Sequence, residues 1–501
     1  MKAKKVLVLL LVLALLFTTA CGGGKDSDQA KDSITIGIDS DATALDPLRI
    51  NDTLTMSILS NVYEPLVRMT TDSQIVPALA TEWTISEDGL EYVFTIRTDA
   101  TFHNGDPITV DDVKYSLEAA VESPYTGPYM NFIDHVEIVD DQNVKVVLQY
   151  AYAPFLALCT TYSQVVKEDF YADGGTMMSK EPIGSGPYKF VSWAQGDKLE
   201  FEAYDGYYGG APSITKLTYK IIANSTTAAI ALETGDIDVS LNVGSADIAA
   251  LEEKDGITLL KDPSSAFYFV GLNTKVDKLS DVRVRQAIAK AINKENLIIG
   301  ALDGYGVATN TFIAEGLPGY NPDFDPLPYD VEGAKKLMAE AGYPDGFDLT
   351  ISIPESRSAH AQMLKADLAQ IGINLNIGII ETGAFWDALE NLDYEMMIMG
   401  WSYVVMDPDV GYYSLYKKDD LSGNYTGFGN AEIDGLLQAG RTATNDEERA
   451  KIYAELEEKV MTQAPYVPLY WRVDAVAFNS DLTGIEIPPC GFYYVYDYAW
   501  K

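Results

Sequence analysis

The sequence predicts an α/β protein with an antiparallel first half and a second half of alternating helices and strands. In the first half, several pairs of alternating apolar and polar runs are joined at turn residues, which is typical of β-hairpins. From residue 282 onward, helical and strand patterns alternate, and such a series builds right-handed crossovers and a largely parallel sheet with helices on both faces. The 501 residues are 47% hydrophobic and 22% charged, a globular composition that predicts two or three domains.

The first twenty residues have a composition of their own. A basic start, MKAKK, precedes the apolar run VLVLLLVLALLF and the small residues TTA, and this order predicts a secretory signal peptide. A membrane-spanning helix needs about 20 apolar residues, and this run is shorter. Cys21 follows the cleavage point in a pattern that resembles a bacterial lipobox, with Thr18 in place of the usual large aliphatic residue. We therefore expect a lipid anchor on Cys21 and a flexible tether over residues 21–33, with ordinary secretion as the alternative.

The mature chain is strongly acidic. Removal of residues 1–20, which contain three lysines and no acidic residue, changes the formal net charge from −38 to −41. Such a charge disfavours nucleic acid and anionic membrane surfaces as partners, and its main effect is solubility. Apart from Cys21, the mature chain contains only Cys159 and Cys490. We expect two separate core thiols, and a disulfide between them is the alternative.

The elements of the first half are well delimited by turn and capping residues. ITIGIDS (34–40) reads as a strand, and TISEDGLEYVFTIR (84–97) reads as a hairpin in which Asp88 and Gly89 supply the turn. Thr109 and Asp112 form a capping-box pattern that starts a helix, which we expect to end near Val121. Two more hairpins are predicted at 135–150 and 188–204.

The second half supplies the candidate binding edge. The pattern predicts helices at 331–342 and 360–372, each closed by a glycine, a helix at 385–392, and strands at 347–353, 373–380 and 394–399. In open sheets of this kind, ligands bind outside the carboxyl ends of the strands. The segment GWSYVVMDPDVGYY follows the last strand. We expect Gly400 to free the backbone there, so that Trp401 and Tyr403 face a crevice.

A structural explanation of the same segment remains open. Trp401, Tyr412 and Tyr413 could instead form an aromatic corner packed into the core. The Asp407-Pro408 pair could simply set a turn.

Eight motifs together resemble one family. They are LDP (45–47), YEPLV (63–67), a long signature from 76 to 117 that contains TFHNGDPITVDDVKYSL, IGSGPYKF (183–190), YYGGAP (207–212), ALETGDIDV (231–239), VRQAIAKAIN (284–293) and GWSYVVMDPD (400–409). In this order they are similar to the family 5 extracellular solute-binding proteins of ABC importers, which include dipeptide, oligopeptide and nickel binders. The resemblance covers nearly the whole mature chain.

The resemblance implies a large two-lobed periplasmic-binding-protein fold of type II. Lobe one is expected at 34–270 plus 480–501, with an inserted subdomain at about 65–185, and lobe two at 271–479. The chain is expected to cross between the lobes near FYFVGLNT and AVAFNS. A ligand, expected to be a short peptide, is enclosed as the lobes close.

The implied partners are importer permease subunits with their ATPases. The protein is expected to be a lipid-anchored monomer on the extracellular face of the membrane, periplasmic in a two-membrane bacterium, with no cofactor and no metal.

Site roles carried over from the family need care at each position. Val404 stands where peptide binders have an aspartate that pairs with the peptide amine, and Asp407 is a candidate replacement. Arg357 looks like the arginine that holds a dipeptide carboxylate in some members, and a solvated loop arginine is the alternative. The family segments also make Tyr63, Tyr268 and Asn273 candidate ligand contacts.

Other chemistries find little support. The three histidines, His103, His135 and His360, lie far apart and form no HExxH motif, so a zinc site is not expected, and His103 is expected to be structural. Neither a phosphate-binding Gly-Lys-Ser/Thr loop nor a GxSxG motif is present. A secreted acidic glycosidase is the alternative from another class. Oligosaccharide or chelated nickel as ligand, and a receptor that presents its ligand to a signalling protein, also remain open.

Overall fold

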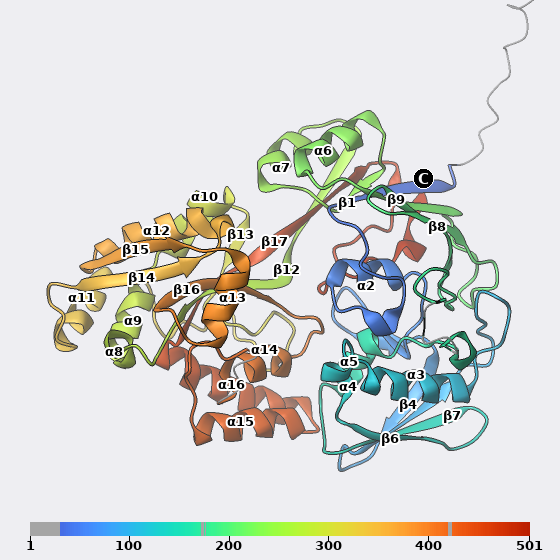
Figure 1. The fold of residues 1–501 in the computed structure, drawn as a ribbon, viewed down its shortest axis with the longest axis horizontal. Helices are drawn as coiled ribbons and strands as arrows, with labels where there is room; N and C mark the ends of the chain where they lie inside the picture. The colour runs from blue at the N-terminus through green and yellow to red at the C-terminus, as the bar shows by residue number, and fades with distance from the viewer. Residues whose placement is uncertain (1–30, 172–174, 176, 419–422) are drawn as a thin grey trace, which may run out of the picture.

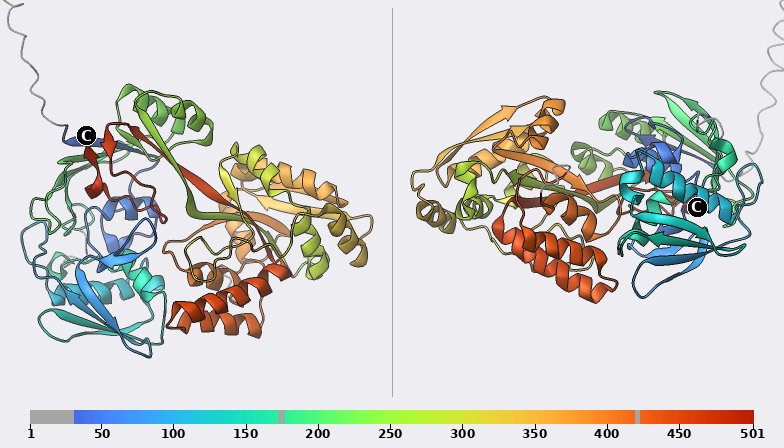
Figure 2. Two further views of the ribbon diagram at one scale, coloured as in Figure 1. Left: turned by 180° about the vertical axis from the view of Figure 1, so that it is seen from behind. Right: turned by 60° about the horizontal axis from the view of Figure 1, so that its bottom comes forward.

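A computed structural model describes residues 31–171, 175, 177–418 and 423–501. The predicted signal peptide, Cys21 and most of the predicted tether lie outside these residues. The chain forms two lobes joined by two long antiparallel strands, β12 (Ile257–Leu272) and β17 (Tyr466–Asn479), which run diagonally between the lobes in Figure 1 and are called the crossing ribbon below. Figure 2 shows the same ribbon from behind and from below.

One sheet of eleven strands runs through both lobes. Its order is β15-β14-β16-β12-β17-β11-β1-β10-β9-β8, and β13 (Gly306–Ala308) pairs with β17 off this path. Lobe one holds β1 (Ser33–Ile38), β8 (Tyr188–Ala194), β9 (Lys198–Ala203), β10 (Lys216–Ile221) and β11 (Val239–Ser240); lobe two holds β14 (Phe347–Ile353), β15 (Ile373–Ile379) and β16 (Met396–Ser402). Strand β14 is parallel to both β15 and β16, which confirms the parallel sheet predicted for the second half.

Lobe one also contains a smaller unit with its own sheet. The order of that sheet is β4-β5-β7-β6, all antiparallel, and the unit includes the hairpin of β2 (Val67–Met69) and β3 (Ile75–Pro77). The strands are β4 (Ala80–Ile85), β5 (Glu91–Ile96), β6 (Ile133–Ile138) and β7 (Asn143–Leu148), and the helices are α3 (Val110–Glu122), α4 (Gly127–Met130) and α5 (Phe155–Tyr162). The predicted hairpins are confirmed here and at β8-β9. The predicted capping box is confirmed as well, since Thr109 and Asp112 bond reciprocally at the start of α3.

Helices surround the rest of both lobes. Lobe one has α2 (Thr53–Leu59), α6 (Ser225–Thr234) and α7 (Ser245–Glu252); lobe two has α8 (Asp277–Ser280), α9 (Val282–Ala291), α10 (Lys294–Leu302), α11 (Val331–Glu340), α12 (Ser358–Ala369), α13 (Thr382–Glu390), α14 (Pro408–Tyr416), α15 (Ala431–Thr442) and α16 (Asp446–Gln463). As predicted, α11 and α12 are each followed by a left-handed glycine, Gly342 at φ 93° and Gly372 at φ 82°. Within the described part of the chain, no helix combines the length and apolar character that crossing a bilayer requires.

The sheet of lobe two is packed on both faces. One face of strands β12, β14, β16 and β17 packs against α9 to α12, and the opposite face of β12, β16 and β17 packs against α13 to α16. Consecutive residues of a strand therefore enter different cores. Cys159 and Cys490 are both buried and both free, so the disulfide alternative is not realised.

The lobes also meet away from the crossing ribbon. Near the start of α5, the Tyr152 hydroxyl donates to the Asp409 carboxylate at 3.3 Å, and the Ala153 amide donates to the Arg441 carbonyl at 2.9 Å. These hydrogen bonds join the small unit of lobe one to α14 and α15 of lobe two.

Candidate functional site

A cleft of about 480 Å³ lies beside the crossing ribbon, between the two lobes. Its lining from lobe one includes Asp39 after β1 and Asn242 after β11, and its lining from lobe two includes Tyr305 after α10. Strand β17 contributes Arg472 and Asp474. This inter-lobe cleft is bounded by surfaces from both lobes and by the strand that joins them.

Two other hollows are present, and the smaller one is also lined by residues of both lobes. A cavity of about 450 Å³ is lined by Trp471, which alternates with Arg472 along β17, so it lies on the opposite face of the crossing ribbon. A larger hollow, about 900 Å³, lies beside edge strand β8 and is lined by residues of lobe one between His103 and Glu202. The larger volume of this third hollow does not make it the binding site, because a ligand there would not bridge the lobes.

Arg357 lies at the carboxyl end of β14, at the edge of the sheet that faces lobe one. Its guanidinium carbon is 4.7 Å from the centre of the Tyr268 ring, and Nη2 donates to the Tyr268 hydroxyl at 3.2 Å. The Tyr268 ring in turn stacks on Tyr470, with ring centres 4.9 Å apart, and the Tyr470 hydroxyl is 2.7 Å from His360 Nε2. Arg357 is therefore held on a stack of aromatic rings rather than extended into solvent. Its expected role as a carboxylate ligand stays a prediction.

The prediction that Gly400 frees the backbone after the end of a strand is wrong. Strand β16 does not end before Gly400 but continues to Ser402, with Gly400 paired to Tyr268 of β12. A Cβ atom added to Gly400 would lie 2.6 Å from Cε1 of the Tyr268 ring. Glycine is needed at this position because the Tyr268 ring lies directly against the backbone of β16.

Trp401 and Tyr403 do not form one wall of a pocket. Tyr403 is only 1% exposed, and its hydroxyl donates to the Phe312 carbonyl at 2.7 Å, so this residue is part of the core. The expectation that Tyr403 faces a crevice is therefore wrong, and the structural explanation holds for the fully buried Tyr412. Trp401 is half-buried against the same core as Tyr403. Its contact with a ligand stays a prediction.

The carboxylate of Asp407 is occupied by protein partners. It accepts from the Asp409 backbone amide as the N-cap of α14 and pairs with Arg449 at 2.7 Å, with both side chains buried. Beside it, Asp409 pairs with Arg441 at 2.8 Å. Asp407 is therefore not placed to take over the amine-binding role that Val404 lacks, because its charge is already balanced by a buried guanidinium.

Tyr63 and Asn273 are also structural. The Tyr63 hydroxyl is buried and donates to the Leu45 carbonyl at 3.1 Å. The Asn273 amide is buried and donates to the Leu392 and Tyr394 carbonyls at 2.9 and 2.8 Å, which ties the end of β12 to the approach of β16. Both residues use their polar atoms on backbone groups, so the expectation that they contact the ligand is not supported.

His103 has the structural role expected of it. Its Nδ1 accepts from the Gly184 amide at 3.2 Å, so Nε2 carries the proton that is donated to the Gly186 carbonyl at 3.0 Å. Burial lowers the pKa of His103 to about 4, which keeps the ring neutral at physiological pH.

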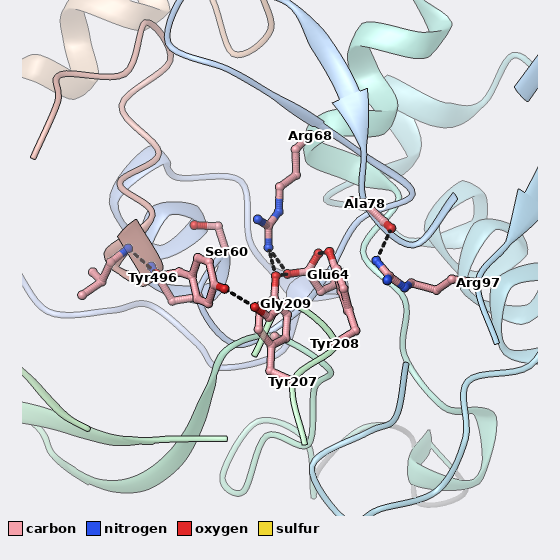
Figure 3. Close-up of polar contacts among 12 residues, drawn as sticks. Ser60, Glu64, Arg68, Ala78, Arg97, Tyr207, Tyr208, Gly209 and Tyr496 are labelled. Atoms are coloured by element: carbon pink, nitrogen blue, oxygen red, sulfur yellow. Dashed lines mark hydrogen bonds and ion pairs between the residues drawn. The ribbon is translucent and has the colours of Figure 1, made fainter. Parts of the chain in front are cut away.

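A buried charged cluster inside lobe one was missed by the sequence analysis. Glu64 is completely buried and accepts from Arg68, from Tyr207 at 3.0 Å and from Tyr208 at 3.0 Å, as Figure 3 shows. Arg97 lies over the Tyr208 ring at 3.3 Å from its centre. The cluster joins the YEPLV and YYGGAP motifs, which are far apart in the sequence. The sequence feature that could have predicted the cluster is Glu64 inside an apolar run, because a buried carboxylate requires a buried partner.

Comparisons with known proteins agree with this architecture. The model of the bacterial extracellular solute-binding proteins, family 5 Middle, matches residues 74–423. Heme-binding protein A of Haemophilus influenzae is 30% identical over 86% of this chain and 85% of its own length. The dipeptide-binding protein of Escherichia coli is 28% identical over 84% of this chain and 85% of its own length. The structure of HbpA2 from Haemophilus parasuis superposes with a TM-score of 0.86, at 27% identity over 94% of this chain and 100% of that one. This chain belongs to the family 5 extracellular solute-binding proteins of bacteria.

Proposed function

We propose that this protein binds a short peptide between its lobes and delivers it to the permease of an ABC importer, whose partner subunits hydrolyse ATP. The inter-lobe cleft is the observation that carries the proposal, because its walls come from both lobes and from the strand that joins them. The relative named for dipeptide binding supports a peptide as the ligand. An oligosaccharide or a chelated nickel ion are the competing ligands for the same fold.

The proposed mechanism is closure of the two lobes around the ligand. A ligand that touches both lobes gains contacts in the closed form that the open form cannot offer, so binding shifts the population towards the closed form. Small-angle scattering of the protein with a saturating ligand should show a smaller radius of gyration. An unchanged profile at saturation would refute closure.

A peptide panel tests the function directly. We expect calorimetry to detect binding of short peptides with no accompanying hydrolysis. An oligosaccharide panel under the same conditions covers both the sugar ligand and the glycosidase alternative. Turnover of any oligosaccharide would favour an enzyme, and mass spectrometry of the molecule that co-purifies with the protein would identify its natural ligand.

The remaining parts of the proposal concern the lipid anchor, the tether and the division of the chain into lobes. We propose a lipid on Cys21, a tether over residues 21–33, and lobes divided at the positions that the family resemblance implies. Two acyl chains give stable membrane attachment. Cys21→Ser should therefore release the protein into the medium, and membrane retention of that variant would refute the anchor.

A further inference from the structure

The segment that leads into α14 carries apolar side chains of lobe two into lobe one. Val405 is fully buried, and it belongs to the hydrophobic core of lobe one rather than to the two cores of lobe two. Val404 and Val410 are half-buried and pack against the same core of lobe one. The segment from Val404 to Val410 therefore contributes apolar surface to a core that the other lobe builds.

A polar contact between the lobes lies next to this segment. The Tyr152 hydroxyl of lobe one donates to Asp409 at 3.3 Å, and Asp409 pairs with Arg441 at 2.8 Å. The Arg441 guanidinium lies against one ring from each lobe, with its carbon 3.2 Å from the centre of the Tyr413 ring and 5.1 Å from the centre of the Tyr152 ring. The Ala153 amide donates to the Arg441 carbonyl at 2.9 Å. Lobe one therefore supplies hydrogen bonds to both residues of an ion pair that belongs to lobe two.

We propose that Val405, Tyr152, Ala153, Asp409 and Arg441 form a latch, which is made when the cleft is closed and separates when the cleft opens widely. In Figure 1 the crossing ribbon passes between the lobes in the upper half, whereas α15 and the small unit of lobe one lie at the bottom. When two lobes turn about a hinge, the displacement of facing residues grows with their distance from it. The latch therefore stabilises the closed form through contacts of the chain itself, which goes beyond the proposed function because no ligand takes part.

The apolar and polar parts of the latch favour the closed form for different physical reasons. Wide opening moves the Val405 side chain from a core into water, so the loss of two methyl groups in Val405→Ala should lower the ratio of closed to open protein about tenfold. Tyr152→Phe removes one hydrogen bond and keeps the ring beside Arg441, so the ratio should fall about threefold. The pair of Asp409 and Arg441 lies within lobe two and stays together in both forms.

The first experiment measures closure of the latch without a ligand. Ala151 of lobe one and Thr444 of lobe two lie close together, since a Cβ atom added to Gly89 would be 3.3 Å from Cβ of Ala151 and 2.9 Å from Cγ2 of Thr444. Cysteines are placed at positions 151 and 444 of the Cys21→Ser protein and joined with a short bismaleimide, which can bridge them only while the latch is closed. Peptide mass spectrometry then gives the crosslinking rate.

The variants of the latch should slow this crosslinking. We expect Val405→Ala to lower the rate about tenfold and Tyr152→Phe about threefold. Val146→Ala is the matched control, because Val146 is equally buried in the same core but pairs only with strands of lobe one, so the rate should not change. The parent protein shows whether the buried native thiols, Cys159 and Cys490, react. Equal rates in the wild type and both latch variants, or equal slowing by Val146→Ala, would overturn the proposal.

The second experiment separates the latch from the proposed binding of peptides. Saturating trialanine should bring the crosslinking rates of Val405→Ala and Tyr152→Phe back towards that of the wild type, because a bound peptide adds its own contacts to the closed form. If trialanine does not bind and the latch variants still slow crosslinking, the latch stands and the peptide part of the proposed function fails. If trialanine binds and all crosslinking rates are equal without it, the function stands and the latch is refuted.

Discussion

The substitution Gly400→Ala tests the packing on which the position of Arg357 depends. The added Cβ would lie 2.6 Å from Cε1 and 2.8 Å from Cζ of Tyr268, whereas carbon atoms in favourable contact are about 3.5 to 4.0 Å apart. The Tyr268 ring must therefore shift by about 1 Å, and Tyr470 and Arg357, which pack on its two sides, must move with it. Overpacking of this kind costs about 1 to 3 kcal/mol, which urea denaturation should detect as a lower unfolding free energy.

A double-mutant cycle separates this overlap from any other effect of the substitution. In the Tyr268→Ala background the ring is gone, so Gly400→Ala should cost less than about 0.5 kcal/mol. Gly435→Ala is the matched control, because an added Cβ there meets no atom within 4 Å on the exposed side of α15. It should stabilise the protein by up to about 1 kcal/mol. The reasoning fails if Gly400→Ala costs the same in both backgrounds.

Three further predictions concern buried charges and the half-buried tryptophan. Arg449→Gln leaves the Asp407 carboxylate buried without its partner, and the unfolding free energy should fall by about 3 to 5 kcal/mol in urea denaturation. Burial raises the pKa of Glu457 to about 7, so the stability of the wild type relative to Glu457→Gln should be highest below about pH 4.5 and should fall by about 3 kcal/mol as the pH rises past 7, measured by denaturation across that range. Trp401→Ala should weaken ligand binding by about 2 kcal/mol in calorimetry with the fold intact.

Each of these predictions has a clear contrary outcome. Lys451→Ala breaks an exposed ion pair with Glu447 and should cost less than about 1 kcal/mol, so an equal cost for Arg449→Gln would contradict the buried-pair argument. Parallel pH profiles for the wild type and Glu457→Gln would show that this carboxyl does not titrate as described. Undiminished affinity of Trp401→Ala would place Trp401 in the core alone.

The elements that were predicted correctly depend on neighbours in the sequence. The hairpin turn at Gly89, with φ 70°, and the capping box of Thr109 and Asp112 are set within a few residues, so the chain itself specifies them. The end of β16 was missed because pairing with β12 decides it, and Gly400 pairs with a residue 132 positions earlier, Tyr268. The sequence does not indicate which distant strand extends another.

The candidate site was predicted less well than the fold, for a related reason. Tyr403 and Asn273 carry polar groups that could serve a ligand or a backbone carbonyl, and their partners lie 91 and 119 residues away. Residue type alone does not separate these two uses. Arg357 was singled out by the resemblance to the family, and its contact with a ligand stays a prediction.

The second contact between the lobes limits how the cleft opens. Two bodies joined at one flexible place can swing in any direction, but bodies joined at two separated places rotate only about the line through both. The crossing ribbon is one such place, and the pair of hydrogen bonds from Tyr152 and Ala153 to lobe two is the other. While both connections persist, the lobes can open only by rotation about the line that passes through them. A motion in any other direction must first break the Tyr152 and Ala153 bonds.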